Sequence, residues 1–346
     1  MLLSTAGCGS HSSTPTAAPV SARESPSAAA TAPSAREDAA ISFDPTTGRL
    51  ILFGGLAEQC TPHVFAPRER ADAEAVWVLE GKKWVATHPK GAPDAAAVIA
   101  GSMAYDPALH EIVYVGTGRV GAKGPQPTWL TDGSTWRRAP GLQAPLIDAP
   151  GMAYSAHRRA VVVWPRPYGG ALRAFDGSWK AIASPPLDSA TNWLGVTGTQ
   201  HPGWDLIAVS SSAYGGSTLR TWVNSGGTWR QLPTTTPAPM SLGWAVLSPT
   251  PDGAGVLLAA APVYRGANPI AWQLGSNQRW TPLRDSGPLT DRVNESFAYD
   301  SRDHRILMFG GSTRDGRTKY DDTWSFDGTA WTLLNPGTGP TVCAQH

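Results

Sequence analysis

Charged residues, cysteines and long apolar runs are all scarce in this sequence. Asp, Glu, Lys and Arg make up only 16% of the chain, and the net charge is +1. This composition argues against a polybasic protein that binds nucleic acid or a membrane surface. No run of about 18 apolar residues occurs, so the sequence predicts no transmembrane helix. It has three cysteines and no CxxC pair, and it lacks the HExxH, Walker and GxSxG motifs.

Tryptophan, in contrast, recurs along the chain at intervals of about 50 residues. The recurring positions are Trp84, Trp136, Trp179, Trp229, Trp280 and Trp331. Self-similarity at such a period indicates a chain built from one repeated supersecondary unit. A repeat fold is a scaffold, so we expect any activity to lie in loops that the repeat does not specify.

Each of these tryptophans belongs to a predicted hairpin. The segments before them include LTDGST and SFDGTA, and Asp-Gly between two short strands favours a tight turn because glycine accepts positive φ. The front half of the repeat is patterned too, as in AAISFDPTTGRLILFGG (39–55) and SFAYDSRDHRILMFGG (296–311), where a polar turn joins two apolar strands. The unit therefore has four strands, here called a to d in chain order.

Six such units fill residues 39–334. The predicted fold class is all-β, a six-bladed β-propeller with four antiparallel strands in each blade. The expected blades are about 39–92, 93–147, 148–190, 191–239, 240–290 and 291–334, followed by a closing tail at 335–346. We interpret the tryptophan stripe as packing between blades, because aromatic side chains at a fixed register bury large areas.

Several stretches resemble kelch repeats. ILFGG (51–55) and ILMFGG (306–311) are apolar strands that end in a glycine pair, and DDTWSFDGTAWTLL (321–334) is similar to the c–d hairpin of that family. The resemblance covers about 39–334 and is strongest in blades one, two and six. In the middle blades the positions near the expected glycine pair are Pro165, Ser211 and Ala260.

This resemblance implies a kelch-type propeller similar to the central domain of galactose oxidase. We do not expect the copper chemistry of that enzyme, because Cys60 is the only cysteine in the blades and no convergent His pair accompanies it. The bacterial N-acetylneuraminate epimerases are also kelch propellers, so the resemblance leaves an enzyme acting on a carboxylated sugar as an alternative.

Four histidines lie at or near the a–b turns, at His110, His157, His201 and His304. They belong to different blades, so they cannot all approach one ion at the roughly 2.1 Å that zinc–imidazole bonds require. We interpret them as turn residues and predict neither a metal nor a cofactor.

The N-terminus resembles the end of a bacterial lipoprotein signal peptide, in which small residues precede a lipid-modified cysteine. Residues 1–8 would be part of that signal, with its true start upstream, and Cys8 would carry the lipid. Residues 9–38 are rich in Ser, Thr, Ala and Pro, as expected of a disordered tether. We therefore expect an extracytoplasmic monomer attached to the bacterial cell membrane only through this anchor. A disordered tail with an unmodified cysteine is the alternative.

The other two cysteines are candidates for a disulfide. In an a-b-c-d blade the b–c loops and the chain after strand d lie on the same face of the ring. Cys60 is in the b–c loop of blade one, and Cys343 follows strand d of blade six, beside it. A Cys60–Cys343 bond would join the two ends of the ring and would agree with export. Two unpaired thiols remain the alternative.

The b–c loops vary most in sequence, and variable loops on a rigid frame commonly carry binding sites. Arginine offers a planar fork for carboxylate or phosphate, and tyrosine offers a flat face with a polar end. The ligand-binding candidates are Arg68, Arg119, Arg166, Tyr168, Tyr264, Arg265, Arg292, Arg314 and Tyr320. Alternatively, these arginines are solvated and pair with local carboxylates such as Asp315 and Asp321.

The predicted function is a non-catalytic binding module whose ligand, a protein or a cell-envelope glycan, is held on the b–c face. The alternative is an enzyme, epimerase-like or lyase-like, that acts on an anionic sugar at the mouth of the central pore. Glu295 would be its general base, because it precedes an innermost strand.

Overall fold

The computed structural model describes residues 31–57, 76–93, 100–117, 126–142, 151–164, 171–186, 191–212, 219–234, 239, 245–260, 271–313 and 315–342. Within these ranges the chain forms six antiparallel sheets of four strands that follow one another in sequence. No helix of the described residues is long and apolar enough to cross a membrane.

Each of the six sheets is one blade, and its strands a to d are neighbours in chain order. Blades one and two contain β2 (Ala40–Asp44), β3 (Arg49–Phe53), β5 (Val76–Glu80) and β6 (Lys83–Thr87), then β7 (Ala100–Asp106), β8 (Glu111–Thr117), β9 (Gln126–Thr131) and β10 (Trp136–Leu142). Blades three and four contain β11 (Gly151–Ser155), β12 (Ala160–Trp164), β13 (Arg173–Phe175) and β14 (Trp179–Ala181), then β15 (Thr191–Gly198), β16 (Leu206–Ser212), β17 (Arg220–Ser225) and β18 (Thr228–Gln231). Blades five and six contain β19 (Ala245–Pro249), β20 (Val256–Ala260), β21 (Ala271–Leu274) and β22 (Trp280–Pro282), then β24 (Ser296–Asp300), β25 (Arg305–Phe309), β28 (Thr323–Phe326) and β29 (Trp331–Asn335).

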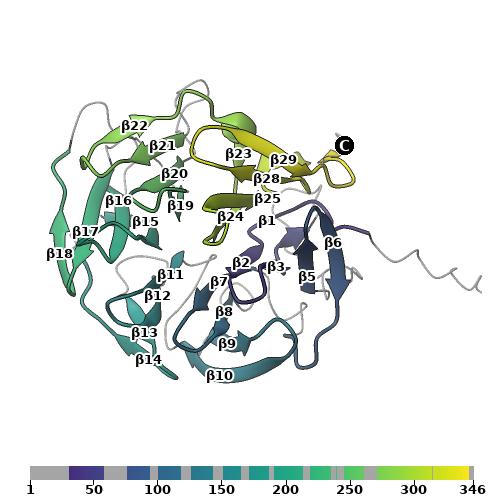
Figure 1. Ribbon diagram of the computed structural model, residues 1–346, viewed down its shortest axis with the longest axis horizontal. Helices are drawn as coiled ribbons and strands as arrows, with labels where there is room; N and C mark the ends of the chain where they lie inside the picture. The colour runs from purple at the N-terminus through teal and green to yellow at the C-terminus, as the bar shows by residue number, and fades with distance from the viewer. Residues whose placement is uncertain are drawn as a thin grey trace, which may run out of the picture.

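The six blades close into a ring (Figure 1). The innermost strand of every blade contacts the innermost strand of the next, and β24 of blade six contacts β2 of blade one. This arrangement confirms the predicted all-β, six-bladed propeller with four antiparallel strands per blade.

A seventh four-stranded sheet lies where the ring closes, and the sequence pattern did not predict it. It is made of four strands of two residues each, β23 (Arg292–Val293), β26 (Ser312–Thr313), β27 (Thr318–Lys319) and β30 (Thr341–Val342). A single 3-10 turn, Gly287–Asp291, precedes β23. The sheet combines the entry into blade six, the b–c loop of that blade and the chain after strand d.

The first strand of the described residues also lies at this junction. Strand β1 (Arg36–Glu37) pairs with β4 (Leu56–Ala57) from the b–c loop of blade one, and Figure 1 shows it between the first and sixth blades. The backbone N–H of Arg36 donates to Tyr320 O, and Gly311 N–H donates to Arg36 O. Strand β1 lies within the segment 9–38 that we expected to be a disordered tether, and Arg36 is 1% exposed.

We call this junction the seam, and it comprises residues 34–39, 54–57, 292–296, 310–313 and 319–323. In the a-b-c-d order, strand b ends and strand a begins on the b–c face, so the seam residues belong to that face.

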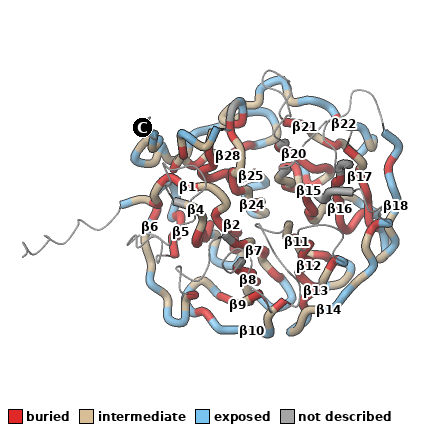
Figure 2. Tube along the Cα trace, turned by 180° about the vertical axis from the view of Figure 1, so that it is seen from behind, coloured by how far each residue is buried: buried red, intermediate tan, exposed pale blue. Residues whose placement is uncertain are grey.

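The core lies between blades rather than within them. Trp84 of blade one packs with Ala298, Leu307 and Phe309 of blade six, and Trp280 of blade five packs with Ile207 and Val223 of blade four. Figure 2 shows the consequence, with buried residues concentrated on the inner strands and exposed residues along the outer ones. The recurring tryptophans therefore join neighbouring blades, as their period predicted.

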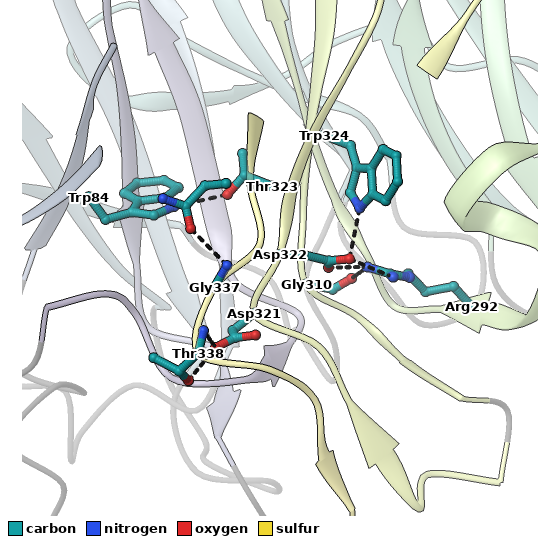
Figure 3. Close-up of polar contacts among 10 residues, drawn as sticks. Trp84, Arg292, Gly310, Asp321, Asp322, Thr323, Trp324, Gly337 and Thr338 are labelled. Carbon is teal, nitrogen blue, oxygen red and sulfur yellow. Dashed lines mark hydrogen bonds and ion pairs between the residues drawn. The ribbon is translucent and has the colours of Figure 1, made fainter. Parts of the chain in front are cut away.

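Four of these indoles also donate hydrogen bonds to the preceding blade: Trp229 donates to Ala183 O at 2.9 Å, and the other three donate to a threonine hydroxyl. Trp84 Nε1 donates to Thr323 Oγ1 at 2.9 Å, across the seam (Figure 3). The same contact joins Trp179 to Thr128 at 3.0 Å and Trp280 to Thr221 at 2.8 Å. Each threonine begins or nearly begins strand c and directly precedes a tryptophan.

Candidate functional site

Glycine pairs at the end of strand b explain how the chain fits into the seam. Gly54–Gly55 follows β3 and Gly310–Gly311 follows β25, all with positive φ. A Cβ at Gly55 would lie 2.9 Å from Glu37 O, and one at Gly310 would lie 2.5 Å from Arg36 O. The glycine pairs of blades one and six therefore give β1 room to cross between them.

Arg292, one of the two sequence-predicted ligand residues within the described ranges, is held by several contacts in the seam. Its Nη1 donates to Gly310 O at 2.9 Å and to Asp322 Oδ1 at 2.5 Å, and its Nη2 donates to Asp322 Oδ2 at 3.0 Å (Figure 3). The guanidinium carbon lies 3.8 Å from the centre of the Tyr320 ring. Trp324 Nε1 adds a bond of 2.7 Å to Asp322. Both terminal nitrogens of Arg292 are thus used inside the protein.

A second ion pair, between Glu37 and Lys319, ties β1 to the b–c loop of blade six. Lys319 Nζ lies 3.0 Å from Glu37 Oε1 and 3.0 Å from Leu56 O, and Lys319 is 4% exposed. The other carboxylate oxygen of Glu37 accepts bonds from Ser312 Oγ at 2.6 Å and Asn294 Nδ2 at 3.1 Å. Burial pushes the pKa of Glu37 upward, but the Lys319 charge and these hydrogen bonds outweigh it and hold the pKa below its usual value.

Glu295 has a different environment, although it lies in the same stretch of chain. It is 6% exposed, and its Oε2 has no hydrogen-bond partner among the described residues. Burial raises the pKa of Glu295 to about 7, while its own backbone N–H and the charge of Arg292 act in the opposite direction. Because it directly precedes β24, an innermost strand, it lies on the b–c side of the ring.

Asp321 and Asp322 are adjacent but serve different parts of the seam. Asp321 Oδ2 accepts from both the backbone N–H and the Oγ1 of Thr338, each at 2.6 Å (Figure 3). Asp321 thus fixes the chain that follows strand d, whereas Asp322 pairs with Arg292. Arg317 lies 3.9 Å from Asp315, an exposed pairing of the kind that we considered as the alternative for the loop arginines.

The structure brings together three of the predicted site residues, Arg292, Tyr320 and Glu295. The others lie outside the described residues, as do the three cysteines: Arg68, Arg119, Arg166, Tyr168, Tyr264, Arg265, Arg314, Cys8, Cys60 and Cys343. No group of three or more His, Cys, Asp or Glu side chains that could hold a metal ion occurs in the described ranges.

Sequence reasoning missed Glu37, Lys319 and the role of Asp322. Glu37 lies in the Ser/Ala/Pro-rich segment, and Lys319 in a polar loop, so neither has a local pattern that marks it as buried. The adjacent pair Asp321–Asp322, two residues before Trp324, was the one available signal, because buried carboxylates require partners.

No protein-family model matches the sequence, and no curated protein is similar to it at a significant level. Several solved structures nevertheless share its fold. A protein of unknown function from Dyadobacter fermentans is 15% identical, with a TM-score of 0.54 over 88% of this chain and 95% of that one. SapL1 lectin, solved with α-methyl fucoside, is 13% identical, with a TM-score of 0.53 over 87% and 95%. YjhT is 13% identical, with a TM-score of 0.50 over 88% and 98%. At these identities the likeness concerns the fold alone, which is an all-β propeller.

Proposed function

We propose that this protein is a non-catalytic binding module that holds a glycan on its b–c face. The observation that carries the proposal is the buried polar framework of that face at the seam. The Arg292–Asp322 and Lys319–Glu37 pairs hold the strand ends from which the loops leave. Loops on a rigid support can present side chains in a fixed arrangement, which is what recognition requires.

The opposite face is built differently. Its turns are short, and their polar groups bond within the turn or to the next blade. Asp44 Oδ1 accepts from Thr46 N–H at 2.8 Å, and Asp327 Oδ1 accepts from Thr329 N–H at 2.8 Å. These turns leave little sequence for a binding site, so the longer b–c connections are the better candidates.

A propeller of similar fold supports the choice of a glycan over a protein. SapL1 is described as a lectin and was solved with a fucoside. Its identity to this chain is too low to transfer a site. It does indicate that this architecture can serve sugar recognition, and a protein ligand remains an outcome of the test.

The proposal predicts binding that depends on loop arginines. The intact protein, labelled and applied to an array of neutral and anionic glycans, should bind at least one class. Arg119→Ala, Arg166→Ala or Arg265→Ala should weaken that binding about tenfold, which corresponds to roughly 1.4 kcal/mol. Arg230→Ala on the outer strand of blade four is the matched control and should bind as the wild type does. Absence of binding to any glycan at millimolar concentration, or equal loss in the control, would contradict the proposal.

The proposed location is the outer side of the bacterial cell membrane, with the lipid on Cys8. The support is the resemblance of residues 1–8 to a lipoprotein signal. When the chain is expressed in bacteria behind a complete signal, a labelled fatty acid should be incorporated. Cys8→Ser should abolish the label, and persistence of the label in that variant would exclude Cys8 as the attachment site.

An enzyme is a second candidate, and Glu295 is the observation that favours it. A buried carboxyl with one unpartnered oxygen and a pKa of about 7 has the properties of a general acid or base. Against an anionic substrate, both terminal nitrogens of Arg292 are already engaged. NMR of anionic sugars mixed with the protein should reveal conversion that Glu295→Gln removes. If the wild-type protein leaves every such sugar unchanged, this candidate fails.

A further inference from the structure

We infer that the seam is a proton-controlled latch, which neutral Glu295 keeps closed and ionised Glu295 loosens. This inference goes beyond the proposed function and needs no ligand. It concerns how the first and last blades stay together, and therefore how firmly the b–c face is held at the seam.

The residues on both sides of Glu295 hold the N-terminal segment. Asn294 O accepts from Asp38 N–H at 3.0 Å, and Ser296 Oγ donates to Ala39 O at 2.7 Å. Asp38 and Asn294 both have positive φ, at 54° and 58°. Such a backbone is uncommon for residues other than glycine and persists only where the surroundings hold it. A change at Glu295 therefore acts directly on the contacts that close the ring.

The side chain of Glu295 is buried in the seam and begins next to Gly311. A Cβ at Gly311 would lie 3.1 Å from Cβ of Glu295 and 3.0 Å from Cγ of Arg292. Both side chains thus begin beside Gly311, at the turn that leads into the b–c loop of blade six. Oε2 of Glu295 and Nε of Arg292 are each buried, and neither has a partner in the described part of the chain.

The other charged groups of the seam already have partners. From β23, Arg292 pairs with Asp322, and from β27, Lys319 pairs with Glu37 of β1. The remaining charged groups of the seam are Arg36, which donates to Gly54 O and Ser34, together with Asp38 and Asp321, the latter bonded to Thr338. Ionised Glu295 would thus be a further buried anion in a seam where Arg292 and Lys319 each already have a carboxylate. Burying a charge without a partner is costly, and opening the seam to water would relieve that cost.

The direction of the pH effect follows from the raised pKa of Glu295. A carboxyl whose pKa is raised by folding stabilises the folded state in full below its usual value of 4.5, and this stabilisation is lost as the pH rises through about 7. The lowered pKa of Glu37 has the opposite effect, but only in acid, below its usual value of 4.5. Between about pH 5.5 and 8.5, Glu295 therefore changes charge while Glu37 stays ionised.

Hydrogen exchange of the intact protein tests the latch. Peptides covering residues 34–44 and 290–313 should exchange faster as the pH rises from 6 to 8, after correction for intrinsic rates. The increase in opening should approach tenfold per pH unit below 7, the limit for one ionising group, and should level off above 7, where Glu295 is ionised in the open and the closed seam alike. Glu295→Gln should show no such increase, because the amide stays neutral. Glu80→Gln, which removes an exposed partner of Arg49, is the matched control and should behave as the wild type does.

Two results would overturn the inference. One is a seam whose corrected exchange in the wild type stays constant from pH 6 to 8. The other is an equal rise in the peptide 151–164 of blade three, which would mean that the whole ring, rather than the seam, responds. Both results come from the wild-type protein alone, so the test remains decisive if Glu295→Gln does not fold.

Discussion

The interblade indole bonds follow a simple rule at the level of single residues. The tryptophan of strand d donates to a threonine hydroxyl of the preceding blade when that blade has threonine just before its strand-c tryptophan, as at Thr128, Thr221 and Thr323. Blade three lacks this threonine, and Trp229 of blade four donates to the backbone oxygen of Ala183 instead. Blade one has Val76 at this position and blade five has Ala271. The indoles that face them, Trp136 and Trp331, have no hydrogen-bond partner for Nε1 in the described residues. The orphaned donors are thus explained by two apolar substitutions in the repeat.

This rule predicts a substitution that adds a hydrogen bond. Val76→Thr, which keeps the side-chain shape, should give Trp136 an acceptor worth about 1 kcal/mol. That gain should offset the cost of burying the hydroxyl and leave the free energy of unfolding near or above that of the wild type. Val209→Thr, equally buried at 0% exposed, is the control and should lose about 1–3 kcal/mol. Equal losses in urea denaturation of the two variants would refute the rule.

The reverse substitution should be costly. Thr221→Val removes the acceptor of Trp280 without leaving a cavity, so it should lower the free energy of unfolding by about 1–3 kcal/mol, the cost of an unsatisfied buried donor. Urea denaturation measures this loss. In a Trp280→Phe background there is no indole N–H left unsatisfied, so Thr221→Val should cost much less there than in the wild type. Independent, additive effects of the two changes would show that the bond contributes nothing.

The Glu37–Lys319 pair predicts a second, acid-side dependence of stability. Lys319→Met leaves Glu37 buried without its cation and should cost about 3–5 kcal/mol at pH 7. Since folding lowers the pKa of Glu37, its stabilising contribution is present above 4.5 and is lost as the pH falls further. The variant should therefore lose less stability than the wild type between pH 5 and 3. Denaturation curves across that range measure both effects. If the free energy of unfolding fell equally in the variant and the wild type between pH 5 and 3, the ion pair would not be the cause of the acid dependence.

At the level of elements, β1 has only two residues but contacts both of the blades that close the ring. It contacts the glycine pairs of two blades and contributes Glu37 to the ion pair with Lys319. A chain that begins at Ala39 should keep its blades but lose several degrees of thermal stability. A chain that begins at Ser34 retains β1 and should melt as the full chain does. Thermal unfolding followed by circular dichroism distinguishes them, and identical melting of all three would mean that β1 is dispensable.

The elements that could be predicted from the sequence are those with local, repeated signals. Each blade repeats an apolar strand, a polar turn and a tryptophan hairpin, so the six-bladed ring was predictable from its period. The seam was not, because its contacts join residues that no local pattern connects. Glu37 and Lys319 are 282 residues apart, and their strands have two residues each. Glu295 and Arg292 could be assigned to the pore mouth, but the pairing of Arg292 with Asp322 required the structure.

At the level of the whole molecule, the described residues close the ring through hydrogen bonds, ion pairs and packing. The Cys60–Cys343 disulfide, which lies outside those residues, remains a prediction. Replacing both cysteines by serine should lower the melting temperature under oxidising conditions without changing the circular dichroism spectrum. The loss could reach several kcal/mol, although such bonds often contribute less than chain entropy suggests. An unchanged melting temperature would mean that no stabilising bond forms.

The seam also sets an order of events during synthesis. Trp84 of the first blade donates its hydrogen bond to Thr323, which lies 239 residues later, so the contact cannot form until the last blade has been made. At about 5–20 residues per second, the first blade waits roughly 12–48 s with the flank that blade six will cover still open to solvent. A growing chain of this kind is an open arc with apolar edges. Chaperones or other chains can bind those edges until blade six is complete.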